Sequence, residues 1–210
     1  MLLLVVGLVL FLGAHSVRIV ADGWRASTIA SIGEKPWKVA YSLVSVAGFV
    51  LIVLGFSLAR QQGPHLLWPV PPAWTRHLAA LLTLFAFVLV AAAYVPGNAI
   101  KLAVRDPMVL GVAVWAFAHL LANNTDVDFV LFAPFLAWAV ADYLVAQGRR
   151  RKEGYSAQLS PHGSEAAKVA ERAGVARAGS TVITIVVGAL AWAVFAFWIH
   201  GWWIGVRPFG

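Results

Sequence analysis

Residues 106–152 read DPMVLGVAVWAFAHLLANNTDVDFVLFAPFLAWAVADYLVAQGRRRK. Two apolar runs, residues 108–122 and 129–146, flank the polar turn Asn123-Asn124-Thr125-Asp126, and a basic run follows at residues 149–152. A turn this short joins only antiparallel neighbours, so we expect the two runs to form a helical hairpin. A basic run directly after an apolar helix is typical of the cytoplasmic side of a membrane protein.

The rest of the chain is equally apolar. Of its 210 residues, 61% are hydrophobic and 12% charged, and the mean hydropathy is +0.81. A soluble domain has roughly 25% charged residues, so lipid must face much of this surface. Runs that approach the roughly 20 residues needed to cross a bilayer are residues 2–21, 39–59, 78–95, 108–122, 129–146 and 181–199. We therefore predict an all-α fold, a polytopic transmembrane bundle of about six helices, in which Asp106 is the N-cap and Pro107 the first residue of the fourth.

The basic residues are divided unevenly between the two sides of such a bundle. The loops after the first, third and fifth spans hold 13 of the 16 Lys and Arg residues, and only Arg60, Arg76 and Arg207 lie on the other side. Cytoplasmic loops are rich in Lys and Arg, so we predict that both termini lie outside and that the loop at residues 148–179 is cytoplasmic. The net charge of +7 then reflects topology and requires no nucleic acid. The expected partner is membrane lipid, and we expect the basic residues 149–152 to contact anionic lipid headgroups.

The predicted organisation has three parts: a membrane core at residues 1–147, a basic loop at 148–179, and a last helix with a short tail at 180–210. Within the loop, residues 164–178 are compatible with a surface helix, although their Ala-rich composition favours a solvated linker. The N-terminal run lacks a basic start and a cleavage site, so we interpret it as a retained helix. The chain has no cysteine, which excludes disulfides and thiolate ligands. Phosphate-binding and hydrolytic motifs are also absent from the sequence.

Ionisable side chains inside the predicted spans are few, and those that stand out are His15, His119 and Asp142. Each costs at least about 2.5 to 3.5 kcal/mol at the centre of a bilayer, so each needs a reason. A single buried histidine is often a neutral, hydrogen-bonded imidazole. Two histidines on separate helices, each preceded by alanine, suit axial ligation of haem b. The alternatives are a proton relay and a non-haem metal site.

The depth of the two histidines tests whether they could share one cofactor. At 1.5 Å per residue, His15 lies about 20 Å from the outer end of its helix and His119 about 18 Å from the inner end. In a hydrocarbon core of about 30 Å, these levels differ by roughly 8 Å. A tilted ligand axis could span this difference, whereas a flat sandwich could not.

Helical periodicity predicts neighbours for both histidines. Arg18 shares a face with His15, and Trp115 and Asn123 share a face with His119. Asp142 lies about level with His15, where its carboxylate could orient that imidazole or pair with Arg18. Four cations lie on the inner side: Arg18, Lys38, Lys101 and Arg105. They could pair with haem propionates, or their side chains could simply extend to the membrane–water interface. The reserve ligand is His77, near the outer interface.

Several motifs together resemble the NnrU family. They are Phe11-Leu-Gly-Ala-His15-Ser-Val-Arg18, Ile32-Gly33-Glu34 followed by Tyr41-Ser42-Leu43, Leu67-Trp68, and Asp106-Pro107-Met108-Val-Leu-Gly111 leading into Trp115-Ala-Phe-Ala-His119-Leu-Leu-Ala-Asn123. The resemblance covers about residues 1–145 and is most specific in the last motif. It implies a multi-pass protein of the bacterial inner membrane. The family takes its name from an association with denitrification. The family is similar to 15-cis-zeta-carotene isomerases, membrane enzymes that hold haem b through histidines.

By this resemblance, His15 and His119 match the two haem-ligand positions. Many relatives have histidine where this chain has Asp106, and no cysteine stands near Ala116 to replace a histidine at iron. The resemblance implies a haem b protein that acts as a redox-dependent cis-trans isomerase of a carotenoid-like polyene. A haem protein of nitric oxide or nitrite metabolism without isomerase activity is the alternative. A third hypothesis is a structural or transport bundle whose histidines only pack.

Overall fold

The computed structural model describes residues 1–158 and 176–209, with side chains from 153 to 158 left out. Regular structure in these residues is helical, apart from one isolated β-bridge between Leu66 and Thr125. The helices are α1 (Leu2–Val20), α2 (Asp22–Ile32), α3 (Glu34–Gln61), α4 (Ala73–Tyr94), α5 (Ala99–Val104), α6 (Pro107–Ala122), α7 (Asp126–Gln158), α9 (Ala178–Val194) and the π-helix η1 (Phe195–Ile204). The all-α prediction is confirmed.

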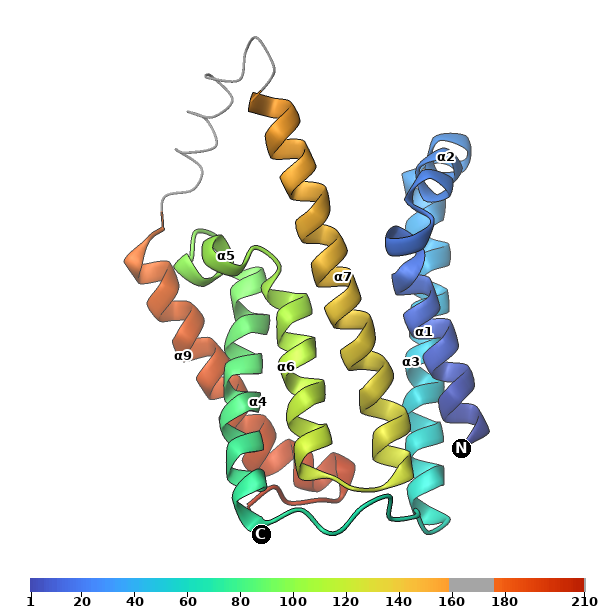
Figure 1. The fold of residues 1–210 in the computed structure, drawn as a ribbon, viewed down its shortest axis with the longest axis vertical. Helices are drawn as coiled ribbons and strands as arrows, with labels where there is room; N and C mark the ends of the chain where they lie inside the picture. Colours follow the sequence, from blue (N-terminus) through green and yellow to red (C-terminus); the bar gives the residue numbers. More distant parts are fainter. Residues whose placement is uncertain (159–175, 210) are drawn as a thin grey trace.

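The long helices form a row rather than a closed ring. Neighbours along the row are α3, α1, α7, α6, α4 and α9, so α7 stands between α1 and α6 (Figure 1). Five spans are long and apolar enough to cross a membrane, those of α1, α3, α4, α7 and α9 with η1. Helix α6 is shorter but equally apolar, as predicted for the fourth span. The described residues therefore form a polytopic helical bundle.

Three features were not predicted from the sequence. The loops that follow the first and third spans contain the short helices α2 and α5. Helix α7 continues well beyond residue 146, to Gln158. The last span ends in a π-helix, η1. The surface helix considered for residues 164–178 lies almost entirely outside the described residues.

Glycines allow the closest helix contacts. A Cβ atom added to Gly55 on α3 would lie 2.3 Å from the backbone nitrogen of Leu4 on α1, and one on Gly48 would lie 2.7 Å from that of Phe11. On the other side of the bundle, a Cβ on Gly188 of α9 would lie 2.6 Å from Val88 Cα on α4. Small residues let backbones approach in this way, and in lipid such packing replaces the hydrophobic effect between helices.

At one end of the bundle the turn before α7 is tied to the loop after α3. The turn is the predicted hairpin turn, and α6 and α7 do pack as neighbours. The backbone N–H of Leu67 donates to the Asn124 carbonyl (2.8 Å), and the Asn124 side chain donates to the Trp68 carbonyl (2.8 Å). At the start of α7 the Thr125 hydroxyl accepts a hydrogen bond from the Asp128 backbone N–H (3.2 Å) and donates one to the Asp128 carboxylate (2.6 Å), so the Thr125 side chain satisfies one of the free N–H groups there.

At the opposite end α7 is held by its arginines. Arg149 donates to the Arg18 carbonyl of α1 (3.1 Å), and Arg150 pairs with Asp106. Helix α6 begins at Pro107 with Asp106 as N-cap, as predicted, but the Asp106 side chain makes no cap hydrogen bond. Two of the arginines expected to meet anionic lipid thus also have partners within the protein.

Beside this end lies an unusual turn. The Asp106 N–H donates to the Val104 carbonyl (2.7 Å), which closes a γ-turn centred on Arg105. Arg105 has φ 64°, the only positive φ of a non-glycine residue in the described part of the chain. This turn is the rarer, strained γ-turn, and it leads the chain from α5 into α6.

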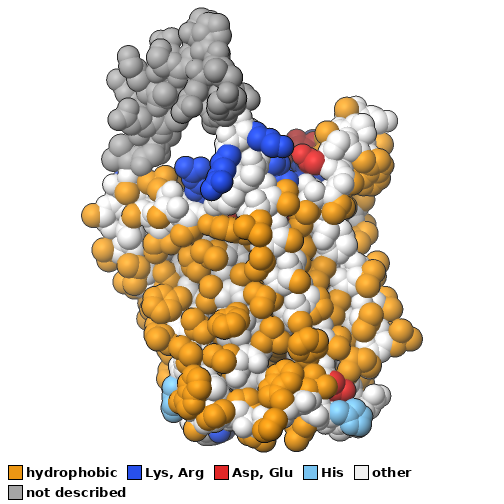
Figure 2. Space-filling model, viewed as in Figure 1, with side chains coloured by type: hydrophobic (Ala, Val, Ile, Leu, Met, Phe, Trp, Pro, Cys, Tyr) orange, Lys and Arg blue, Asp and Glu red, His pale blue; other side chains and the backbone are white. Residues whose placement is uncertain are grey.

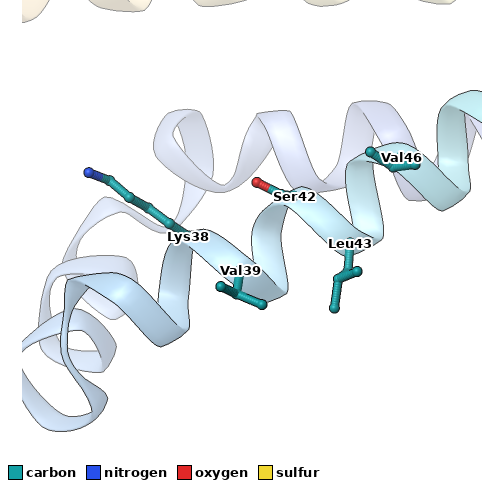
Figure 3. Close-up of a pocket in the computed structure, with 5 residues that line it drawn as sticks. All are labelled: Lys38, Val39, Ser42, Leu43 and Val46. Atoms are coloured by element: carbon teal, nitrogen blue, oxygen red, sulfur yellow. The ribbon is translucent and has the colours of Figure 1, made fainter.

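Apolar side chains cover the body of the bundle, and Lys and Arg gather at the end where α7 leaves it (Figure 2). Both described chain ends lie at the opposite end (Figure 1). This division matches the predicted charge asymmetry between the two sides. A shallow hollow of about 330 Å³ on the outward face of α3 is lined by Lys38, Val39, Ser42, Leu43 and Val46 (Figure 3). Neither intramembrane histidine lines it, so it is separate from the candidate site.

Candidate functional site

His15 lies where α1 meets α3 and α7. Its Nδ1 is 2.7 Å from the Phe11 carbonyl one turn earlier, and its ring stacks on Phe11 with centroids 4.2 Å apart. Tyr41 of α3 and Trp138 of α7 complete the surroundings, at centroid distances of 5.3 and 5.9 Å. Because a carbonyl only accepts hydrogen bonds, Nδ1 must carry the hydrogen. Nε2 then has a free lone pair.

His119 is anchored in the same way on α6. Its Nδ1 is 2.8 Å from the Trp115 carbonyl, again one turn earlier. Its ring stacks on Phe132 of α7 at 4.5 Å and lies 5.2 Å from the Trp115 ring. No hydrogen bond reaches Nε2 of either histidine from the described residues. Each imidazole therefore has the orientation and tautomer of a histidine that binds a metal through Nε2.

The two histidines lie on opposite sides of α7, and aromatic rings occupy the space between them. Phe135 of α7 contacts Phe11 at 5.8 Å and Trp115 at 5.6 Å. Phe132 and Trp138, which contact His119 and His15, are six residues apart on α7 and so differ in height by about 9 Å. This agrees with the offset expected from the sequence. The donors suit axial ligation of haem one by one, but in this arrangement the pair does not frame an open site for one haem.

The neighbours predicted for His119 are present. Trp115 provides the carbonyl and a ring contact. The Asn123 side chain donates to the His119 backbone carbonyl (2.8 Å) rather than to its imidazole. Asn123 therefore ends helix α6 and contacts His119 only through its backbone.

The neighbours predicted for His15 are less direct. Arg18 accepts a hydrogen bond at its carbonyl from Arg149, and its side chain forms no ion pair with another described residue. Asp142 is bonded neither to His15 nor to Arg18 within the described chain. Neither predicted role of Asp142 is seen.

The inner-side cations differ in whether their side chains already have a partner within the protein. Lys38 pairs with Glu34 (2.8 Å), and Lys101 donates to the Ala93 carbonyl (2.7 Å). Arg105 is exposed at the γ-turn, and its side chain has no ion-pair partner in the described residues. Arg18 and Arg105 are thus the cations of this set that remain available to an anionic group. The reserve ligand His77 is exposed on α4.

Sequence reasoning missed the polar neighbours of His15. Ser45 Oγ and Trp138 Nε1 are buried without a hydrogen-bond partner in the described structure. Tyr41 and Ser45 are one turn apart on α3, and Gly48, a further turn along, packs on Phe11, so both hydroxyls face α1 near His15. The available signal was the spacing of Tyr41, Ser45 and Gly48, and it was overlooked because α3 reads as a uniformly apolar span.

Two aromatic side chains of α7, Phe132 and Phe135, were also missed. Phe132, Phe135 and Trp138 recur every third residue, which places them along one side of a helix. The described residues contain no group of three or more His, Asp or Glu side chains that could hold a metal ion.

Fold and site together define a polytopic α-helical membrane protein with two intramembrane histidines presented from separate helices. A family model described as NnrU protein matches residues 3–208, and the chain belongs to the NnrU family. The match extends beyond residues 1–145, which carry the motif resemblance, and includes α9. No curated protein and no solved structure matches the chain.

Proposed function

We propose that this protein binds haem b, with His15 and His119 as the axial ligands. The observation that carries the proposal is the shared geometry of the two imidazoles, each with Nδ1 bonded to a backbone carbonyl and Nε2 left without a partner. Placing two imidazoles inside apolar helices is costly, and metal ligation gives both a function. Arg18 and Arg105 are the inner-side cations available to propionates, and Trp115 orients His119.

A pyridine haemochrome spectrum of the purified protein tests the proposal. We expect a haem b spectrum, with a Soret band of the six-coordinate, low-spin type before pyridine is added. Protein purified from cells supplied with a haem precursor and lacking any Soret band would favour a structural or transport bundle instead.

Haem, when bound, supplies a redox-active iron. For activity we propose cis-trans isomerisation of a carotenoid-like polyene, as the family resemblance implies. The bundle supports an apolar substrate because α1 and α3 present exposed aliphatic side chains to lipid beside His15. Co-expression with a pathway that makes a di-cis carotenoid, followed by chromatography of extracts from dark-grown cells, tests this activity. Unchanged isomers despite full haem loading would exclude it.

The alternative activity is binding of nitric oxide in nitrogen oxide metabolism. The absence of cysteine favours it, because the chain has no thiolate that could replace a histidine as a ligand. Dithionite-reduced protein should then bind carbon monoxide or nitric oxide, and the oxidised protein should not. Gas binding without any change in carotenoid isomers would place this alternative first.

We also propose that the protein resides in the bacterial inner membrane with both termini outside. The unequal division of Lys and Arg between the two ends supports this orientation. A periplasmic reporter fused after Gly210 should be active, and a cytoplasmic reporter within residues 148–179 should be active as well. Inactivity of both reporters, with the opposite reporters active, would reverse the topology.

A further inference from the structure

The hollow on the outward face of α3 is elongated along the helix. Its lining residues fall in two adjacent rows with a spacing of four, Lys38, Ser42 and Val46 in one row and Val39 and Leu43 in the other (Figure 3). Such rows form ridges, and the groove between two ridges runs lengthwise on the helix. From Lys38 to Val46 the hollow extends about 12 Å, which is most of the roughly 15 Å that one leaflet contributes to the hydrocarbon core.

The polar end of the hollow lies at the level of the lipid headgroups. Trp37 directly precedes Lys38, and its ring meets that of Trp24 on α2 edge-on, with centroids 5.7 Å apart. Tryptophan side chains gather at the membrane–water interface. No residue of α2, which is described throughout, is buried, and α2 packs against α3 at the end of the bundle where α7 leaves it (Figure 1). The Lys38 ammonium is therefore level with lipid phosphates, and the rest of the hollow faces acyl chains.

Lys38 has a partner within the protein, but the pair is weak. Its Nζ lies 2.8 Å from Oε1 of Glu34, one turn earlier, and both side chains are more than two-thirds exposed. An exposed pair at this spacing shifts an equilibrium by only about a factor of two. A lysine beside an anionic lipid surface contributes about fivefold. A phosphate can therefore replace the Glu34 carboxylate as the partner of Lys38.

A second copy of the chain suits this face less well than lipid does. Helix α3 stands at one end of the row, and Val39, Leu43 and Val46 are 60, 66 and 60% exposed (Figure 1). Two copies in one membrane have the same orientation, so a two-fold contact through this face of α3 would bring the two Lys38 side chains together. Like charges at an interface repel, whereas an anionic headgroup attracts Lys38.

We propose that this hollow is a binding site for one anionic phospholipid. The Lys38 ammonium donates to the headgroup phosphate, and the Ser42 hydroxyl, one turn deeper, donates to an ester carbonyl of the glycerol backbone. One acyl chain lies along Val39, Leu43 and Val46. Neither His15 nor His119 lines the hollow, so the site does not depend on the proposed cofactor.

Native mass spectrometry of the full-length protein tests the headgroup contact. The protein is titrated with phosphatidylglycerol and, separately, with phosphatidylethanolamine of the same acyl chains. We expect the first phosphatidylglycerol to bind about fivefold more tightly. Lys38→Gln should remove this preference. Glu34→Gln should raise the affinity for phosphatidylglycerol about twofold, because it frees Lys38.

The matched control is Lys35→Gln. Lys35 carries the same charge three residues earlier but does not line the hollow, so this variant should keep the preference for phosphatidylglycerol. Equal losses in Lys35→Gln and Lys38→Gln would show that surface charge alone attracts the lipid and would overturn the site. A lipid-free dimer that Lys38→Gln strengthens would show that a second copy covers this face, which would overturn it as well.

Filling the hollow tests the acyl-chain contact. Leu43→Trp should abolish the preferred binding of the first phosphatidylglycerol, and because Leu43 is exposed the change disturbs no packing in the bundle. Leu58→Trp is the control, at an exposed position of the same helix outside the hollow. Phosphatidylglycerol with a diazirine on its acyl chain should cross-link within residues 39–46, and less so in Leu43→Trp. Cross-links spread evenly over the exposed faces of α3, α4 and α9, or unchanged affinity in Leu43→Trp, would overturn the site.

Discussion

His15 and His119 share a local geometry but have different surroundings. Both follow an aromatic residue by one turn, and both bond that residue's carbonyl through Nδ1, at 2.7 and 2.8 Å. His15 lies at a junction of three helices, with Tyr41, Ser45 and Trp138 nearby. His119 stacks on Phe132 next to fully buried alanines of its own helix.

The difference shows that local sequence sets the tautomer of each histidine, whereas the neighbouring helices set its polarity. The i−4 hydrogen bond forms within one helix and needs no partner. The polar groups around His15 come from α3 and α7, which reach it only because glycines draw α1 and α3 together. The two candidate ligands are therefore not equivalent, and four predictions test how far the difference extends.

The largest effect is expected from removing the ligands. His15→Ala and His119→Ala should each change the haem spectrum from six-coordinate low spin, and the double variant should abolish haem binding, because each imidazole has one free nitrogen. Absorption spectra of purified variants measure this. His77→Ala is the control and should leave the spectrum unchanged. A normal spectrum in either single variant would remove that histidine from the site.

The next effect concerns the helix contact that shapes only the His15 region. Gly48→Ala places a Cβ 2.7 Å from the Phe11 backbone, so it should lower the free energy of unfolding by about 1 to 3 kcal/mol. Thermal unfolding in detergent checks this. Gly111→Ala, on the His119 side, meets its nearest atom at 3.1 Å and should cost less. Gly13→Ala has open space and serves as the control. Equal losses for all three would contradict the close contact.

A smaller effect, a gain in stability rather than a loss, is expected at Ser45 near His15. Ser45→Ala removes a buried hydroxyl without a partner, so it should raise the free energy of unfolding by about 1 kcal/mol. Thr83→Val is the matched control and should destabilise the protein, because the Thr83 hydroxyl accepts from Trp192 Nε1 (3.1 Å). Destabilisation by Ser45→Ala would instead indicate that a water molecule or ligand bonds Ser45.

The smallest effect is expected at the γ-turn before α6. Arg105→Gly should stabilise the fold by only about 0.5 kcal/mol, because glycine adopts φ 64° without strain but loses more conformational freedom on folding. Arg105→Ala removes the same charge but keeps the Cβ, so it should give no gain in thermal unfolding. If both variants lower haem affinity equally, the guanidinium contacts the cofactor. Equal stability of the two variants would argue against backbone strain at this turn.

Much of the architecture was predictable from the sequence because lipid imposes simple demands. Six apolar runs, Pro107 at the start of α6 and the short turn after Asn123 all correspond to observed helices or turns. Helices α2 and α5 escaped prediction because they are too short and too polar to read as spans. The predicted end of α7 came too early because the basic residues after residue 146 were interpreted as a loop. Outside lipid, charged residues are readily accommodated in a helix, and α7 continues through them.

For the candidate site, too, some features were predictable from the sequence and others depended on the tertiary structure. The apolar context and the position of each histidine within its helix follow from residues next to it in the chain, so both histidines and Trp115 could be identified from the sequence. Which side chains surround each imidazole depends on contacts between residues far apart in the chain. Only the packing of α7 between α1 and α6 placed Phe135 between the aromatic neighbours of the two histidines. Hydropathy and helical periodicity act within one helix, whereas the order of helices in the row depends on contacts between residues far apart in the chain, such as the close glycine contacts between α1 and α3 and between α4 and α9.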